Sequence, residues 1–161
     1  MNDFKGWIEP IKGLRANVAK LLEEFKSEIA DKLTDVTGTN AVLVQRKYHL
    51  MFRDEFDTEK TDLSKLPFTM EIFEKVRPLL IFNSVNYRLV MPNTAYNWHV
   101  DTGKNCIHVP LVTNRGCWFV YDNLCFRMPA DGTVYLVNNE RYHTFMNAGK
   151  IPRLHLTFEL L

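Results

Sequence analysis

Two patterns of apolar residues divide the chain at about residue 80. In the first part, apolar residues recur at intervals of three and four from Leu14 to Leu33, which places them on one stripe of an amphipathic helix. Residues 41–45 have the composition of a strand, residues 53–66 are charge-dense as in a surface loop, and residues 69–76 fit a shorter helix. Residues 1–80 are therefore predicted to form a mainly helical support.

After Pro78 the pattern changes to short β runs separated by turn residues. Eight runs read as strands, and they cover residues 85–92, 95–101, 106–113, 116–122, 124–129, 133–139, 142–147 and 153–160. Pro92-Asn93 and Asp122-Asn123 are typical of the turns between them. Strands at a spacing of roughly ten residues after a helical prefix predict a mainly β fold with N-terminal helices: a double-stranded β-helix, or cupin-like jelly roll.

Composition and charge fit one soluble domain over residues 1–161, with its β core at 83–160. Apolar residues make up 46% and charged residues 24%, which is typical of a globular chain. With 20 basic and 19 acidic residues, charge gives no reason to expect a nucleic-acid or membrane partner. No apolar run approaches the roughly 20 residues of a membrane span. The first residues lack the apolar core of a signal peptide, and the three cysteines form no paired framework, so we expect a cytoplasmic protein.

A possible metal site is indicated by His99, Asp101 and His143. His99 and Asp101 are two residues apart, so on a strand their side chains point to one face. A histidine-x-aspartate pair alone is weak, because it also fits a surface ion pair. In a jelly roll, however, the strand that carries this pair and the strand that begins near His143 are neighbours at one mouth of the barrel. Two imidazoles and one carboxylate there would form the facial triad that binds non-haem Fe(II) and leaves coordination positions open.

Arg153 is the next candidate, because the last strand alternates cleanly. In RLHLTFEL, Arg153, His155 and Thr157 share one face, while Leu154, Leu156 and Phe158 share the other. If the apolar face packs under the helices, Arg153 points into the barrel, where an unpaired guanidinium is costly. An arginine holds a carboxylate through two parallel hydrogen bonds, so the interior favours an anion. The alternative is an arginine that pairs with an acid of the barrel or reaches solvent.

The run MPNTAYNWHVDTG, with IHVPLVTN, GTVYLVNNERYHTFMNAG and PRLHLTF after it, resembles the aspartyl/asparaginyl β-hydroxylase family of 2-oxoglutarate- and Fe(II)-dependent oxygenases, which includes free-proline hydroxylases. The resemblance covers roughly residues 83–160. It implies that His99, Asp101 and His143 bind Fe(II), that Arg153 binds the distal carboxylate of 2-oxoglutarate, and that His108 helps to hold this cosubstrate. Many members have an arginine two residues before the equivalent of His108, where this chain has Cys106.

The implied reaction is hydroxylation of a C–H bond with Fe(II), 2-oxoglutarate and O2, on an amino acid or a peptide or protein side chain. Further residues could support the site or line the substrate: His155, Trp98, Tyr87 and Cys106, with Arg88, Tyr96 and Asn97 also near the expected mouth. Two other classes stay open. A cupin-like metalloenzyme without 2-oxoglutarate would need the triad but not Arg153. A non-catalytic binding module would tolerate damaged ligands, whereas all three ligands are present.

Overall fold

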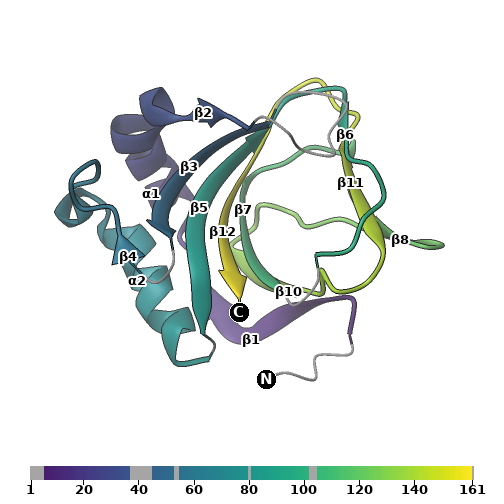
Figure 1. Cartoon of the computed structure of the whole chain (residues 1–161), viewed down its shortest axis with the longest axis horizontal. Helices are drawn as coiled ribbons and strands as arrows, with labels where there is room; N and C mark the ends of the chain where they lie inside the picture. The colour runs from purple at the N-terminus through teal and green to yellow at the C-terminus, as the bar shows by residue number, and fades with distance from the viewer. Residues whose placement is uncertain (1–5, 37–44, 53–54, 80, 102–104, 161) are drawn as a thin grey trace.

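The strands of the protein form two antiparallel sheets that face each other, as the sequence predicts for a jelly roll (Figure 1). The computed structural model describes residues 6–36, 45–52, 55–79, 81–101 and 105–160. The larger sheet has the order β1 (Ile8–Arg15), β10 (Thr133–Val137), β7 (Cys106–Val112), β12 (Arg153–Leu160), β5 (Phe82–Val90), β3 (Gln45–Phe52) and β2 (Thr34–Asp35), and β4 (Glu55–Phe56) pairs with β3. The smaller sheet has the order β6 (Thr94–Ala95), β11 (His143–Asn147), β8 (Cys117–Tyr121) and β9 (Leu124–Phe126).

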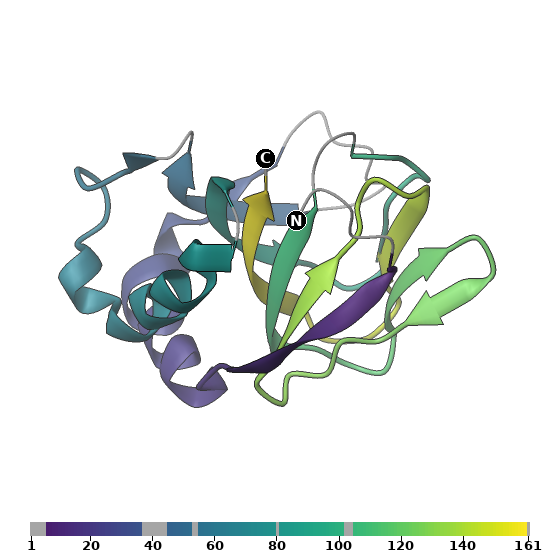
Figure 2. The ribbon, with the colours of Figure 1, turned by 90° about the horizontal axis from the view of Figure 1, so that it is seen from below.

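The helices gather on one side of the larger sheet, away from the smaller sheet (Figures 1 and 2). Helix α1 (Val18–Glu24) continues into a π-helical turn, η1 (Phe25–Ile29), and a 3-10 turn, η2 (Ala30–Lys32). Helix α2 (Pro67–Val76) lies between two 3-10 turns, η3 (Leu63–Lys65) and η4 (Arg77–Leu79). The predicted second helix is confirmed, and it begins at a proline that suits a first helical turn. No helix in the described residues is long and apolar enough to cross a membrane.

The first helix begins later than the sequence predicts, because residues 8–15 form the edge strand β1. Asn17 caps α1, its Oδ1 accepting a hydrogen bond from the Lys20 amide at 3.2 Å. Leu14 is four residues before Val18 and so fits the stripe of a helix, but it lies on β1, whose pairing with β10 shifts register between Pro10 and Arg15, as at a bulge. The prediction of a helix from Leu14 is therefore wrong at its start.

Two predicted strands also differ in extent. Residues 41–44 lie outside the described residues, and β3 begins at Gln45. The predicted strand 95–101 is reduced to β6 and an isolated bridge between His99 and His143. Within the predicted loop 53–66, β4 and η3 are short ordered segments. Positive φ angles at Asn93 and Asp122 confirm two of the predicted turns.

The two faces of β12 have the chemistry that its alternation predicts. Leu154, Leu156 and Phe158 join the apolar core between the larger sheet and the helices. Arg153 and His155 are also buried, but they face the smaller sheet. A second apolar cluster fills the space between the sheets: Val90, Cys117, Phe119, Tyr121, Met128, Tyr135, Val137 and Phe145. The polar pocket described below shares residues with this cluster.

Candidate metal centre and anion pocket

The structure brings His99, Asp101 and His143 together at the edge of the smaller sheet. Each residue offers one ligand atom, and these atoms all lie within 4.8 Å of one another. A pair of backbone hydrogen bonds fixes the two histidines side by side, because the amide of each donates to the carbonyl of the other at 2.9 Å. His99 and His143 therefore face one another although 44 positions separate them in the sequence, and their ring centres are 4.4 Å apart.

Both imidazoles are oriented through Nδ1. The Nδ1 atom of His99 lies 2.7 Å from the carbonyl oxygen of Asn97, and that of His143 lies 2.7 Å from the carbonyl oxygen of Arg141. Because a carbonyl only accepts, each Nδ1 must carry the proton and donate it. This leaves Nε2 of a neutral ring with a free lone pair for a metal, which is the usual arrangement of metal-binding histidines. Burial lowers the pKa of His143, which favours the neutral form further.

Asp101 completes the group of donors. Its backbone amide donates to the carbonyl of Asn139 at 2.9 Å, and its Oδ2 accepts from the Asn139 side chain at 3.3 Å. Its other oxygen, Oδ1, lies 3.8 Å from Nε2 of His99. The carboxylate is thus positioned by Asn139 while one oxygen faces the histidine ligand atoms. Two imidazole nitrogens and a carboxylate oxygen are the donors of an Fe(II) facial triad, so the residues fit that ion.

Arg153 reaches the same pocket from the first residue of β12. Only 4% of the residue is exposed, and its guanidinium carbon lies 4.0 Å from the centre of the Phe145 ring. Burial lowers the pKa of Arg153 to about 10, so the side chain remains a cation at neutral pH. Among the described residues, no carboxylate forms an ion pair with it. A buried cation without an acid is costly, so this part of the pocket is complementary to an anion.

Two further histidines lie beside Arg153. Its Nε is 3.0 Å from Nε2 of His155, and Nδ1 of His155 is 3.1 Å from Nδ1 of His108. Burial, reinforced by the Arg153 charge, lowers the pKa of both histidines well below its usual value. Both rings are therefore neutral at physiological pH, and the positive charge of this corner belongs to Arg153. His108 lines the pocket, whereas His155 packs behind Arg153 and supports it.

The remaining candidate residues divide between the pocket and other sites. Cys106 lines the pocket, but burial raises its pKa to about 11, so it is a neutral thiol. Tyr87 does not face the pocket: alternation on β5 turns it to the helices, where it packs on Phe25 and its hydroxyl lies 2.6 Å from Oγ1 of Thr69. Trp98 is 41% exposed and stacks on Tyr142 outside the pocket, because it alternates with His99.

Several pocket residues were not among the predicted site residues. Phe119 stacks on the His143 ring with a centroid distance of 4.9 Å, and Asn139 orients Asp101. Gln45 accepts a hydrogen bond from the Tyr96 hydroxyl, and this contact joins the two sheets at the pocket. Arg88 and Tyr96, expected near the mouth, do line the pocket. The inward alternation of β5 and β12 could have indicated Arg88 and its partner Glu159, whereas Asn139 gives no pattern in the sequence.

Sequence and structure comparisons place the chain in a known family. The profile of the aspartyl/asparaginyl β-hydroxylase family matches residues 11–161, so the chain belongs to this family. No curated protein sequence matches it. The fold is similar to that of a viral collagen prolyl hydroxylase from Paramecium bursaria Chlorella virus-1, solved with 2-oxoglutarate, at a TM-score of 0.60 and 13% identity over 98% of each chain.

Two other solved structures show the same fold. A prolyl-4-hydroxylase from Pseudomonas putida has a TM-score of 0.57 and 16% identity, over 91% of this chain and 87% of that one. A predicted oxalate decarboxylase from Thermotoga maritima has a TM-score of 0.53 and 14% identity, over 80% of this chain and 91% of that one. The jelly roll is thus shared by 2-oxoglutarate oxygenases and by other cupin-like proteins. The fold alone therefore does not separate these two classes, and the residues of the site have to be used for that.

Proposed function

We propose that the protein is an Fe(II)- and 2-oxoglutarate-dependent oxygenase that hydroxylates a C–H bond of an amino acid or of a peptide side chain. One observation carries the proposal: a pocket that holds His99, Asp101 and His143 also holds the buried cation Arg153, which has no acidic partner among the described residues. A cupin-like metalloenzyme that does not use 2-oxoglutarate has no need of this second feature.

Each residue has a defined task in this proposal. His99, Asp101 and His143 would hold Fe(II), and Arg153 would bind the distal carboxylate of 2-oxoglutarate through its planar fork. When bound, iron and cosubstrate supply the activation of dioxygen, of which one atom enters succinate and the other enters the hydroxylated product, with release of CO2. The protein itself orients both groups and keeps their surroundings dry.

The neighbours of the pocket residues support both the orientation of the bound groups and the exclusion of water. The Nδ1–H donors of His99 and His143 hold the two rings so that Nε2 of each faces the metal position. Phe119 covers one face of the His143 ring, and Phe145 lies under the Arg153 guanidinium. These apolar neighbours exclude water beside the charged groups, which strengthens the electrostatic attraction between Arg153 and a carboxylate.

An anaerobic titration tests the proposal. Purified protein is titrated with Fe(II) and then with 2-oxoglutarate, and the weak visible charge-transfer band of the chelate is recorded. We expect the band in the wild type and none in His143→Ala, because that variant lacks one of three protein ligands. Trp98→Ala is the control, since Trp98 adjoins a ligand in sequence but lies outside the pocket. Iron binding by His143→Ala as tight as that of wild type would contradict the triad.

A turnover assay tests the same proposal independently. With Fe(II), O2 and ascorbate present, slow uncoupled decarboxylation should make succinate accumulate even without a substrate. A wild-type protein that binds Fe(II) but forms no succinate and does not bind 2-oxoglutarate would instead be a cupin-like metal protein of another class.

A further inference from the structure

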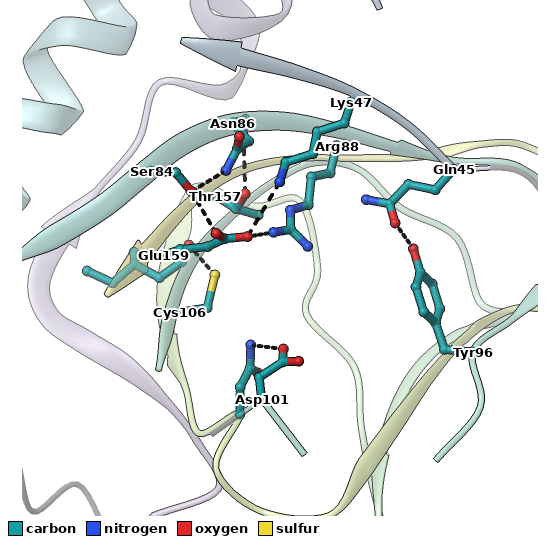
Figure 3. A network of polar contacts seen from close by, with 12 residues as sticks. Gln45, Lys47, Ser84, Asn86, Arg88, Tyr96, Asp101, Cys106, Thr157 and Glu159 are labelled. Atoms are coloured by element: carbon teal, nitrogen blue, oxygen red, sulfur yellow. Dashed lines mark hydrogen bonds and ion pairs between the residues drawn. The ribbon is translucent and has the colours of Figure 1, made fainter. Parts of the chain in front are cut away.

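A second arginine, Arg88, points into the pocket from β5. Figure 3 shows its guanidinium directed into the space between β5 and Asp101, with Glu159 on one side of it and Tyr96 on the other. In the pairing of β5 with β12, Arg88 lies opposite His155 and Val90 lies opposite Arg153. Arg88 and Arg153 therefore occupy adjacent strands and the same inner face of the sheet. The pocket that holds the metal ligands contains two guanidinium groups, each in a different environment.

Arg88 is fixed by a polar network rather than by a ligand. One of its Nη atoms forms an ion pair with Oε1 of Glu159, and Nζ of Lys47 lies 3.6 Å from the same oxygen (Figure 3). The other oxygen of Glu159 accepts a hydrogen bond from Ser84 at 2.7 Å, and Ser84 accepts one from Asn86 at 2.9 Å. Glu159 is thus committed to three donors, and it holds the Arg88 guanidinium in one orientation.

The network does not use all the N–H donors of Arg88. Its Nε is buried and has no hydrogen-bond partner among the described residues, and Glu159 is its acidic partner there. Glu159 also contacts Lys47, so its carboxylate is not reserved for Arg88 alone. Since an arginine has five N–H donors in a fixed fork, Arg88 can bind a second carboxylate while it stays paired with Glu159.

The pocket therefore contains one cation more than the cosubstrate requires. Arg153 is buried, lacks an acid and lies beside the neutral rings of His108 and His155, so it suits the distal carboxylate of 2-oxoglutarate. Arg88 is less buried and has its own anchoring acid, so it remains available when the cosubstrate is in place. A second anion that enters beside the metal ligands is the group that this arginine can receive.

We propose that Arg88 binds a carboxylate of the substrate, so that the enzyme hydroxylates a carboxylic acid, such as a free amino acid or an acidic side chain, and discriminates against the corresponding amide. This inference rests on the proposed function and adds a substrate class to it. A neutral amide cannot form the charge-assisted bidentate contact, and it would leave donors of Arg88 unpaired. Arg88 is then a specificity-determining residue, and Glu159 positions it.

Matched pairs of acids and amides test this directly. Amino acids and their amides, including proline and prolinamide, and short peptides that differ only in aspartate or asparagine are compared by substrate-stimulated succinate formation. For wild type we expect at least one acid to stimulate turnover, with a kcat/KM about 30-fold or more above that of its amide, which corresponds to about 2 kcal/mol of lost charge pairing. In Arg88→Gln this ratio should approach one, and in Arg88→Lys it should be intermediate.

Two further variants keep the test decisive. If Arg88→Gln does not fold because Glu159 is left underpaired, the double variant Arg88→Gln, Glu159→Gln removes both charges and should show the same loss of discrimination. Arg46→Gln is the matched control, because Arg46 is on β3 but is exposed and pairs with Asp35. It should keep the wild-type preference for acids.

The possible failures are distinguishable. Uncoupled succinate formation with no preference for acids over amides, with no stimulation by any acid, or with an unchanged preference in the Arg88 variants would overturn the inference and leave the oxygenase intact. A wild-type protein that neither binds 2-oxoglutarate nor forms succinate would overturn the proposed function itself. Binding is checked independently by the shift that an added acid, but not its amide, causes in the anaerobic charge-transfer band.

Discussion

Strand β12 of the larger sheet has two different faces. Its outer face buries Leu154, Leu156 and Phe158 against the helices, and its inner face buries Arg153 and His155. The two faces are about equally inaccessible to water, yet one is apolar and the other is polar and charged. Apolar burial stabilises the fold, whereas buried polar groups are costly unless they are paired. The difference supports the proposal that the inner face is a ligand site kept at some cost in stability, while the outer face stabilises the fold.

The largest expected effect comes from the outer face. Phe158→Ala removes a fully buried ring from the core between sheet and helices, and this should lower the free energy of unfolding by about 3–5 kcal/mol. The iron bound per folded molecule should not change, because Phe158 points away from the pocket. Urea unfolding measures the first quantity and anaerobic iron titration the second. Ile81→Ala is the control: its side chain is exposed, so it should change stability by less than about 0.5 kcal/mol.

Lowering the pH should decrease the stability of the folded protein through two histidines of the inner face. In the folded protein, burial lowers the pKa of His108 and His155 well below the value of about 6.5 that an unfolded histidine has. Below that pH the unfolded chain takes up protons that the folded chain cannot bind. The stability is therefore fully present above about pH 6.5 and decreases as the pH falls, by about 1.4 kcal/mol for each histidine at pH 5.5.

Urea midpoints of the metal-free protein at pH 7.5 and pH 5.5 test this prediction. In His155→Gln the difference between the two pH values should be smaller by about 1.4 kcal/mol, because one proton-binding site is lost. An unchanged difference would show that His155 is not held neutral by the inner face.

An effect smaller than that of Phe158→Ala is expected from Glu24, a charged residue buried on the outer side. This buried carboxylate accepts hydrogen bonds from the amide and hydroxyl of Thr69, at 2.9 and 2.6 Å, and so joins α1 to the start of α2. Glu24→Gln replaces an acceptor by a donor and should cost about 1–3 kcal/mol of unfolding free energy. Glu23→Gln, an exposed neighbour, should cost less than about 0.5 kcal/mol in the same thermal or urea unfolding experiment. Equal costs for the two would contradict the role of Glu24.

The sequence predicts the inner and outer faces of β12 because strict alternation is a local property of a strand. The same alternation, together with spacing in a jelly roll, predicts that His99, Asp101 and His143 converge, and their ligand atoms do. Periodicity is misleading at Leu14, which has helical spacing to Val18 but lies on the irregularly paired strand β1. For Tyr87 and Trp98 the alternation holds, since they alternate with Arg88 and His99, and the prediction that they belong to the site, which rests on their chemistry alone, is wrong. Asn139 and Gln45 reach the site through long-range pairing, which no local pattern records.

The proposed function requires that the buried cation Arg153 binds an anionic cosubstrate, and this is measured by the affinity of the iron-loaded protein for 2-oxoglutarate under anaerobic conditions. Arg153→Ala leaves one carboxylate buried without its partner, a loss of about 2–5 kcal/mol that weakens binding by about 30-fold to several thousand-fold. Arg153→Lys should recover part of this, since a point charge cannot form the bidentate contact. Iron affinity without cosubstrate should stay close to that of wild type, and Arg46→Gln should bind 2-oxoglutarate normally. Equal 2-oxoglutarate affinity in Arg153→Ala and wild type would contradict the assignment of Arg153 and the proposed function that depends on it.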